Sequence, residues 1–354
     1  MSNKLKYTIL GMMSGTSLDG LDLSLCQFEC ENSDWTYKIL ESKTIAYSNA
    51  EKKWLKSQES CNRNKLQEEH VSFGKFLGTQ AKNFIENSIF PLPDCIASHG
   101  HTIFHKPELG ITFQTGDGQE IAAITKIKTI SDFRQKDISL GGQGAPLVPI
   151  GDLHLFKNYK SCLNLGGSAN ISIKNQNSII AFDICPINYV LNRLAQKEGA
   201  EFDESGNISR SGELDFELLD KLNSLDFYKT SPPKSLGREW VENNIEPLLD
   251  STNISDRDKM RTFSEHIAVQ ISKILPSNTT TLVTGGGAYN NYILELIIKK
   301  TSGKIKIGSQ QLIEFKEAML FAFLAALYLT RQNNCLASVT GAKRDCIGGV
   351  MHNP

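Results

Sequence analysis

Residues 14–17, Ser-Gly-Thr-Ser, form a turn of small residues between two apolar runs, 7–13 and 21–28. A turn of this kind exposes consecutive backbone N–H groups and hydroxyls, and glycine lets a ligand approach the backbone closely. This chemistry suits the binding of phosphate oxygens. The turn is not a Walker loop, because neither Gly-Lys-Ser/Thr nor a helix follows it. A tight hairpin that simply needs glycine explains the same residues equally well.

Three acidic residues stand where a carboxylate could take part in chemistry. Asp19 and Asp22 flank Gly20, and one or two carboxylates beside phosphate oxygens can hold Mg2+, although Asp-Gly is also simply a good turn pair. Asp183 ends the apolar run 179–182 before a predicted helix, so it would be held rigidly, as a general base requires. The alternative for Asp183 is a carboxylate that only stabilises the start of the helix.

Glu317 points from the apolar face of a predicted helix over 312–331. A carboxylate there needs a partner, either a buried arginine in a structural ion pair or a ligand hydroxyl. His99, His101 and His105 crowd one short segment. Because partner ligands at metal spacing are missing, a loop at a binding cleft is favoured over a zinc site.

Glycine-rich segments recur at 141–144, 166–167 and 285–287. The first lies in a run, Leu-Gly-Gly-Gln-Gly-Ala-Pro, that predicts a shaped loop, since so many glycines would weaken a helix or strand. The third joins a predicted strand to a helix, a place where phosphate or nucleotide can bind at the helix N-terminus. Any strand-to-helix turn can also be rich in glycine.

Asp132, Arg134 and Asp137 surround the start of the first glycine-rich loop. A salt bridge that stabilises a hinge is the favoured interpretation. Polar contacts to a substrate are the alternative.

The same pattern of strand, turn, strand, turn and strand occurs in 7–46 and again in 161–183, with a glycine turn near its start. Such a duplication would give two phosphate-contacting hairpins, although repeated meanders are also common β topology. Elsewhere the sequence predicts helical structure over 50–88, a strand from Ile121 toward Asp132, and a helix over Pro186–Glu198.

Composition limits the class of protein. The chain has 354 residues, 22% of them charged, and a formal net charge of −1, so we expect two domains and no binding to nucleic acid or to an anionic membrane. The most apolar stretch, 318–329, is shorter than the ~20 residues that span a bilayer. The eight scattered cysteines include no C-x-x-C pair and are expected to be reduced thiols of a cytoplasmic protein.

Eight segments in one order are more specific than any of them alone: Gly15-Thr-Ser-Leu-Asp-Gly-Leu-Asp22, Ser98-His-Gly-His-Thr102, Asp132-Phe-Arg134, Gly141-Gly-Gln-Gly-Ala-Pro-Leu-Val-Pro149, Asn164-Leu-Gly-Gly-Ser-Ala-Asn-Ile171, Thr284-Gly-Gly-Gly-Ala-Tyr-Asn290, Glu317-Ala318 and Val339-Thr-Gly-Ala342. Together they resemble the anhydro-N-acetylmuramic acid kinase family, a branch of the sugar kinase/Hsp70/actin superfamily. The resemblance implies an α/β fold of two lobes, the actin-like ATPase (ribonuclease H-like) fold, with a mixed sheet flanked by helices in each lobe and an interlobe cleft.

Because no low-complexity linker interrupts the chain, we expect a short hinge near residue 130. The expected N-terminal lobe is 1–130 and the expected C-terminal lobe is 131–331. The segment 332–354 is expected to pack back near the hinge.

The resemblance also implies an activity. Enzymes of the family use ATP and Mg2+ to open the 1,6-anhydro ring of anhydro-N-acetylmuramic acid with water and to phosphorylate O6. The product is N-acetylmuramic acid 6-phosphate, in cell-wall recycling, and the enzymes are commonly homodimers. By resemblance, Asp183 would be the catalytic base, and the carboxylates of Asp19 and Asp22 would hold Mg2+ through the ATP phosphates. The amino-sugar substrate would contact Glu317, His99 and Gln143. ATP itself would be bound by Gly15, Thr16, Ser17, Leu18, Asp19, Gly20, Leu21, Asp22, Gly166, Gly167, Gly285, Gly286 and Gly287.

The sequence departs from the family pattern after the predicted base. The family usually has Asp-Thr-Gly-Pro-Gly-Asn, where this chain has Asp183-Ile-Cys-Pro-Ile-Asn188. This difference motivates two alternatives, a kinase for a different amino or anhydro sugar and a nucleotide-dependent switch protein without catalysis.

Overall fold

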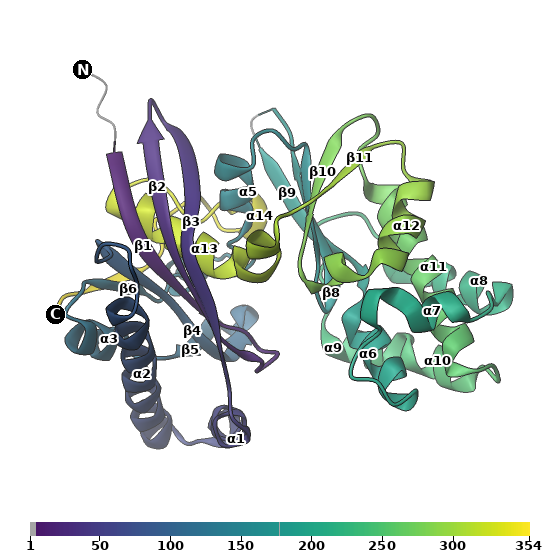
Figure 1. Ribbon diagram of the computed structural model, residues 1–354, viewed down its shortest axis with the longest axis horizontal. Helices are drawn as coiled ribbons and strands as arrows, with labels where there is room; N and C mark the ends of the chain where they lie inside the picture. The colour runs from purple at the N-terminus through teal and green to yellow at the C-terminus, as the bar shows by residue number, and fades with distance from the viewer. Residues whose placement is uncertain (1–4, 177) are drawn as a thin grey trace. The chain divides into compact units, whose positions relative to one another are not determined.

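A computed structural model describes residues 5–176 and 178–354 of the chain (Figure 1). The chain divides into two compact units. Unit 1 comprises Met1–Leu155 and Phe315–Pro354, and unit 2 comprises Phe156–Glu314. Among the described residues, no helix is both long enough and apolar enough to cross a bilayer.

Unit 1 is built on a sheet in which strands lie in the order β12-β6-β4-β1-β2-β3, with β5 paired to β4. The pairs β1–β2 and β2–β3 are antiparallel, whereas β4 is parallel to both β1 and β6. The strands are β1 (Leu5–Ser14), β2 (Gly20–Glu31), β3 (Asp34–Ala46), β4 (Cys95–Lys106), β5 (Ile111–Thr115), β6 (Thr129–Ser131) and β12 (Val350–His352).

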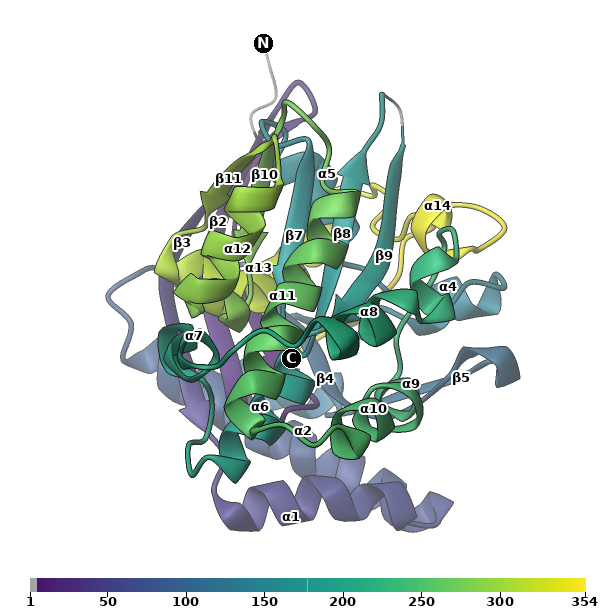
Figure 2. The same ribbon diagram turned by 90° about the vertical axis from the view of Figure 1, so that its right-hand side faces the viewer.

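Unit 2 repeats this arrangement in the order β11-β10-β7-β8-β9. The strands β7, β8 and β9 form an antiparallel meander, and β10 is parallel to both β7 and β11. Figure 2 shows these five strands together with the helices of this unit. The strands are β7 (Ser161–Leu165), β8 (Ser168–Lys174), β9 (Ile179–Pro186), β10 (Thr280–Thr284) and β11 (Lys304–Ile307). The predicted duplication and the actin-like α/β fold class are therefore confirmed by strand order and direction.

Helices flank both sheets. Those whose residues fall wholly or mainly in unit 1 are α1 (Asn49–Ser57), α2 (Arg63–Glu86), α3 (Gly118–Thr125), α4 (Gln135–Ser139), α5 (Pro149–Leu155), α13 (Gln310–Leu329) and α14 (Ala337–Thr340). Those of unit 2 are α6 (Asn188–Lys197), α7 (Asn207–Ser211), α8 (Phe216–Ser224), α9 (Arg238–Asn244), α10 (Glu246–Ser251), α11 (Asp256–Ile274) and α12 (Asn291–Lys300). Short 3-10 turns lie at Gln58–Ser60, Pro107–Leu109, Glu204–Gly206, Asp226–Lys229 and Gly286–Tyr289.

The division of the chain follows the packing of α13. A Cβ placed on Gly11 of β1 would lie 1.9 Å from the carbonyl oxygen of Ala318, so helix and strand touch backbone to backbone. Phe323 of the same helix packs against Trp35 of β3 with ring centroids 5.4 Å apart. These contacts place most of α13 in unit 1, and the division falls after Leu155 and Glu314 rather than at the expected positions 130 and 331.

The strand expected from Ile121 is wrong at its start, where the structure has α3. Asp117 caps this helix by accepting a hydrogen bond from the Gln119 N–H at 2.7 Å. Ile121 is completely buried, and a Cβ on Gly78 of α2 would lie only 3.2 Å from its Cα. Close helix packing therefore takes up the apolar residues that suggested a strand, and β6 is limited to Thr129–Ser131.

The helix expected to begin at Pro186 begins at Asn188 instead. Pro186 is the last residue of β9 and pairs with Ser168 of β8. Because β9 is the edge strand of its sheet, a residue without an N–H donor is tolerated there. As a result, Asp183 lies inside a strand and not at a helix start.

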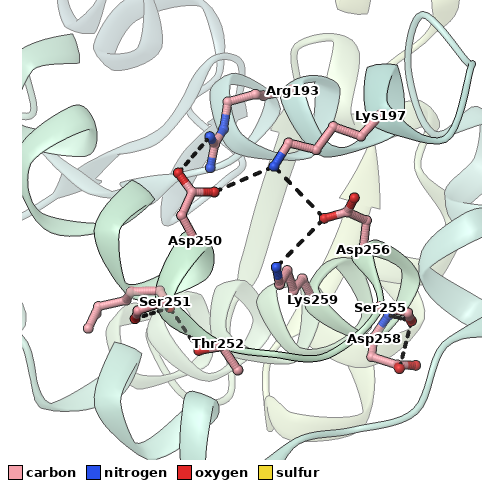
Figure 3. A network of polar contacts seen from close by, with 10 residues as sticks. Arg193, Lys197, Asp250, Ser251, Thr252, Ser255, Asp256, Asp258 and Lys259 are labelled. Carbon is pink, nitrogen blue, oxygen red and sulfur yellow. Dashed lines mark hydrogen bonds and ion pairs between the residues drawn. The ribbon is translucent and has the colours of Figure 1, made fainter.

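A network of charged side chains joins three helices of unit 2 (Figure 3). Asp250 of α10 accepts from Arg193 and Lys197 of α6, each at 3.4 Å, and Lys197 also lies 4.0 Å from Asp256 of α11. Lys259 completes the network at 3.9 Å from Asp256. Only Lys197 and Asp250 are largely exposed to solvent, and each pair of this length contributes little alone. Together the pairs tie the C-terminal half of α6 to α10 and α11.

Candidate active site

The first predicted phosphate turn joins β1 to β2 and is anchored by Leu18. The Leu18 N–H donates to the Gly15 carbonyl at 3.1 Å, and its side chain is buried in the core of unit 1 with φ at +60°. Thr16 and Ser17 are exposed. The turn therefore presents its hydroxyls to solvent while its backbone is fixed from below.

The two glycines of this turn have different surroundings. A Cβ on Gly15 would meet only the Ser17 hydroxyl at 3.5 Å, whereas one on Gly20 would lie 2.5 Å from the Ile45 carbonyl of β3. Gly20 is therefore required by strand pairing. Asp19 is exposed beside it, and the Asp22 carboxylate accepts a hydrogen bond from the Thr44 hydroxyl at 2.6 Å.

Ser14 connects the turn to a buried polar chain. Its hydroxyl accepts from the Tyr47 hydroxyl at 2.7 Å and lies 3.0 Å from Nδ1 of His101. Burial lowers the pKa of His101 and raises that of Tyr47. Both groups are consequently neutral at pH 7, and His101 supports the turn from within the unit.

The second and third glycine segments lie together in unit 2. The second turn is closed by the Gly166 N–H, which donates to the Ser168 carbonyl at 3.2 Å. A Cβ on Gly285 or Gly287 would lie 2.8 Å or 2.9 Å from the Leu165 carbonyl, which directly precedes that turn. Gly286 has no atom within 4 Å of its Cβ position. Two glycines of the third segment thus serve packing, and Gly286 leaves open space.

This difference predicts how alanine substitutions will behave. Gly286→Ala should leave the thermal midpoint unchanged, because the new methyl group meets no atom. It should raise the Kd for ATP by about tenfold if a phosphate or nucleoside approaches this backbone, a cost of ~1.4 kcal/mol. Gly285→Ala should lower the midpoint instead, because φ is +83° and the Asn164 Oδ1 lies 2.6 Å from the new atom. Calorimetry with ATP and a thermal melt separate the two effects; unchanged ATP binding by Gly286→Ala would contradict the assignment.

Asp183 is held on β9 by the segment that precedes α9. Its N–H donates to the Lys234 carbonyl at 3.0 Å, and its Oδ2 accepts from the Leu236 N–H at 2.7 Å. Burial raises the pKa of the carboxyl, and the hydrogen bond from Leu236 opposes that shift. A half-buried carboxylate of raised pKa is suited to accept a proton.

The residues that depart from the family pattern after Asp183 point into the core. Ile184 is 2% exposed, and Cys185 and Ile187 are fully buried in the apolar cluster of unit 2. Their bulk fills the interior behind β9. Core packing therefore explains why these three residues differ from the family pattern. The difference is weaker support for a kinase that acts on another sugar.

In unit 1, His99 and Arg134 form a bidentate contact. The Nε and Nη2 groups of Arg134 donate to Nε2 of His99 at 3.1 Å and 2.9 Å, while Nδ1 of His99 lies 3.0 Å from the Gly100 carbonyl. Because arginine has no acceptor and a carbonyl has no donor, the proton of His99 must be on Nδ1. Arg134 also donates to the Gly144 carbonyl at 2.7 Å.

Glu317 faces the same group. Phe321, one helical turn later, packs on His99 with ring centroids 4.6 Å apart, and the Arg134 guanidinium lies 6.0 Å from its ring. Surrounding protein raises the pKa of the Glu317 carboxyl, and the charges of Arg134 and Lys316 lower it in part. Solvent nevertheless reaches this side chain. Glu317 thus lies near the partly buried Arg134, as its helix position required, and it remains accessible to a ligand.

The structure therefore gathers the predicted sugar-contacting residues around Arg134. His99 and Glu317 are its neighbours, and exposed Gln143 directly precedes Gly144. Sequence reasoning favoured a hinge salt bridge for Arg134; instead, its guanidinium contacts a histidine and a loop carbonyl. Asp137 turns to the loop as well, accepting from the Gly144 N–H at 2.8 Å and the Thr340 hydroxyl at 2.7 Å.

The state of His99 predicts a pH dependence of stability. Burial and the charge of Arg134 lower its pKa well below the ordinary value of 6.5. The unfolded chain therefore binds a proton that the folded chain does not, and the free energy of unfolding should fall as pH decreases below ~6.5, by up to ~1.4 kcal/mol per pH unit. His99→Gln should make that fall shallower in urea titrations at a series of pH values. His105→Gln, at a more exposed histidine, should change it less, and equal slopes for His99→Gln and the natural chain would contradict this role.

Known proteins resemble the chain over nearly its whole length. Residues 7–354 match the family model described as anhydro-N-acetylmuramic acid kinase. A protein of that name from Xylella fastidiosa is 33% identical, with 97% of this chain and 95% of that protein covered. One from Bacillus cereus (strain AH187) is 32% identical, with 98% and 99% covered.

Solved structures match more remotely. A ROK family glucokinase from Streptomyces griseus in complex with glucose and AMPPNP has a TM-score of 0.40 at 11% identity, with 90% of this chain and 98% of that chain covered. The activator of the 2-hydroxyisocaproyl-CoA dehydratase from Clostridium difficile with bound ADPNP has a TM-score of 0.40 at 14% identity, covering 92% and 97%. The full-length family match and the relatives above 30% identity decide the assignment: this chain belongs to the anhydro-N-acetylmuramic acid kinase family.

Proposed function

We propose that the protein is an ATP-dependent kinase that hydrolyses the anhydro ring of 1,6-anhydro-N-acetylmuramic acid and phosphorylates O6. The product is N-acetylmuramic acid 6-phosphate, formed in peptidoglycan recycling. Membership of the family over residues 7–354 supports this function. The single observation that carries the chemistry is the position and pKa of Asp183. Its carboxyl has a raised pKa and lies on β9, which pairs with β8, the strand that follows the second glycine turn.

The residues present fit ATP and Mg2+. The turn at 15–19 exposes hydroxyls above a fixed backbone, and Gly286 leaves space that a side chain would fill. We assign phosphate contacts to both glycine turns and the nucleoside to 285–287. Asp19 and Asp22 supply the carboxylate oxygens that Mg2+ prefers. When bound, ATP supplies the phosphoryl group and Mg2+ offsets its negative charge.

Asp183 has the central role in the proposed reaction. Its carboxylate accepts a proton from water as the water oxygen bonds to C1 of the sugar. The C1–O6 bond breaks, and O6, with its electron pair, would bond to the γ-phosphorus of ATP as the bond from that phosphorus to the bridging oxygen breaks and ADP leaves. Glu317 and Gln143 bind the amino sugar. His99 was expected to contact it as well, but this side chain is buried and both ring nitrogens are engaged; it instead holds the Arg134 guanidinium in position through two hydrogen bonds. We further propose a cytoplasmic homodimer, as the family resemblance implies.

The test is ATP turnover by the purified protein with and without anhydro-N-acetylmuramic acid, with products identified by mass spectrometry. Release of ADP that depends on the sugar, together with a hexosamine 6-phosphate that has gained water, is the expected result. ATP binding without any phosphorylated sugar would refute the proposed substrate. A panel of other amino and anhydro sugars then distinguishes a different acceptor from a protein that does not transfer phosphate.

A further inference from the structure

Two cysteines of unit 1 face each other near the end of the chain. Cys335 and Cys346 form an isolated antiparallel bridge in which each N–H donates to the other's carbonyl at 3.1 Å. In such a hydrogen-bonded pair the Cα atoms are about 5.5 Å apart, within the ~4.4–6.8 Å that a disulfide spans. The Cys335 thiol donates to Oδ1 of Asn334 at 3.5 Å, and the neighbouring Cys346 thiol raises the pKa of Cys335.

The backbone around the pair is fixed by Asn334. This buried side chain donates to the carbonyls of Leu324 and Gly348 at 3.1 Å and 2.9 Å, and accepts from the Gly348 N–H at 2.7 Å. The Asn334 N–H donates to the Cys346 carbonyl at 3.0 Å. The backbone therefore holds the two cysteines opposite each other.

The thiols differ in reactivity. Cys346 is 7% exposed and Cys335 only 1%. The neighbouring Cys335 thiol lowers the pKa of Cys346, as does Lys136, whereas burial, Asp137 and Asp345 oppose that shift; the pKa of Cys335 is raised. Cys346 is thus the thiol that ionises first and that a small oxidant reaches first, and Cys335 is placed to resolve it.

We propose that Cys335 and Cys346 are a redox modification site, in which a hydroperoxide converts the two thiols to a reversible disulfide. The Cys346 thiolate attacks one oxygen of hydrogen peroxide, the O–O bond breaks, and hydroxide leaves, giving a sulfenic acid. The Cys335 sulfur then attacks the sulfenic sulfur, the S–O bond breaks, and the oxygen leaves as water with the thiol proton. Two thiols are oxidised by two electrons and one peroxide is reduced to two waters.

The disulfide would constrain the segment 336–345, which is hydrogen-bonded to the glycine-rich loop that contains Gln143. The segment between the cysteines holds that loop through two backbone bonds, from the Gln143 N–H to the Thr340 carbonyl at 2.8 Å and from the Lys343 N–H to the Leu140 carbonyl at 3.1 Å. Cys335 also lies 3.7 Å from the Phe133 carbonyl, next to Arg134. Oxidation therefore acts on the backbone that carries Gln143 and Arg134.

The experiment treats the full-length reduced protein with hydrogen peroxide, unfolds it, alkylates free thiols and maps the peptides by mass spectrometry. We expect the peptides of Cys335 and Cys346 joined with the loss of two hydrogens and separated again by dithiothreitol, with the remaining cysteines alkylated. Cys346→Ser and Cys335→Ala should abolish the joined peptide. Cys61→Ser, at a cysteine that is only partly buried, should retain it.

Alkylation of both cysteines after peroxide, or conversion of Cys346 to a sulfinic acid while Cys335 remains a thiol, would overturn the proposal. Peptide mapping of the natural chain is decisive even if a variant fails to fold. Hydrogen exchange supplies the second measurement. The Gln143 amide should exchange more slowly in the oxidised protein, and unchanged exchange would overturn the proposed effect of the disulfide on the glycine-rich loop. Neither readout needs a sugar or a nucleotide, so both are independent of the proposed kinase activity.

Discussion

Asp183→Asn is expected to lower phosphorylation of the anhydro sugar by about two to four orders of magnitude, the usual contribution of a general base. The amide can still accept the hydrogen bond from the Leu236 N–H that holds this side chain, so the fold should be retained. It cannot take a proton from water. The Kd for ATP, measured by calorimetry, should therefore match that of the natural chain while product formation is lost.

The pH profile provides an independent check on the same residue. Burial raises the pKa of Asp183 above its ordinary value of 3.8, and a base works only when deprotonated. Activity should accordingly fall as pH decreases through that raised pKa, at a higher pH than for an exposed aspartate. Asp226→Asn, at an exposed carboxylate of the same unit, should leave rate and profile unchanged. Substantial turnover by Asp183→Asn would remove this residue from the chemistry.

Local patterns were sufficient to predict the two meanders. Alternating apolar residues and a glycine turn are readable within a few residues, and the structure has β1–β3 and β7–β9 where they were expected. The secondary structure at Pro186 and at Ile121 differs from the prediction, because it depends on residues far away in the sequence. Pro186 is tolerated in an edge strand, and Ile121 is buried against a helix some forty residues earlier in the chain.

The candidate site divides in the same way. Asp183 could be proposed as a base because a carboxylate at the end of an apolar run is a local signal; the structure places it inside β9, and its role stays a prediction. The contact between Arg134 and His99 could not be predicted, because His99 lies 35 residues earlier in the chain and sequence spacing gives no sign of the contact. The glycines show the limit most clearly, since Gly285 and Gly286 are neighbours in sequence but only Gly286 faces open space.

Lys316 is a further residue that the sequence pattern concealed. The run around it indicates an apolar helix, and a single lysine next to Glu317 would ordinarily be assigned to the solvent side. In the structure its Nζ lies 2.8 Å from Oδ1 of Asp152 on α5, and both side chains are at most 7% exposed. This buried ion pair ties α13 to the helix that follows the glycine-rich loop, and so fixes the stretch of α13 that carries Glu317.

Lys316→Met is therefore expected to destabilise the protein strongly. It removes the ammonium that offsets the buried Asp152 carboxylate, and breaking such a pair from one side costs ~3–5 kcal/mol. Urea unfolding followed at pH 7 measures the loss as a lower midpoint. The matched control is Lys65→Met, whose ion pair with Glu69 at 2.9 Å involves a lysine that is 53% exposed; a loss below ~1 kcal/mol is expected there.

The double variant Lys316→Met/Asp152→Leu distinguishes an uncompensated charge from lost packing. If the cost of the single change comes from the buried carboxylate, removing that carboxylate as well should recover most of the stability, because apolar side chains can replace a buried ion pair without loss. A double variant as unstable as Lys316→Met would instead mean that the lysine stem packs irreplaceably between α13 and α5. Recovery of stability with a raised KM for the sugar would identify the pair as the element that sets the position of Glu317 rather than one that the fold requires.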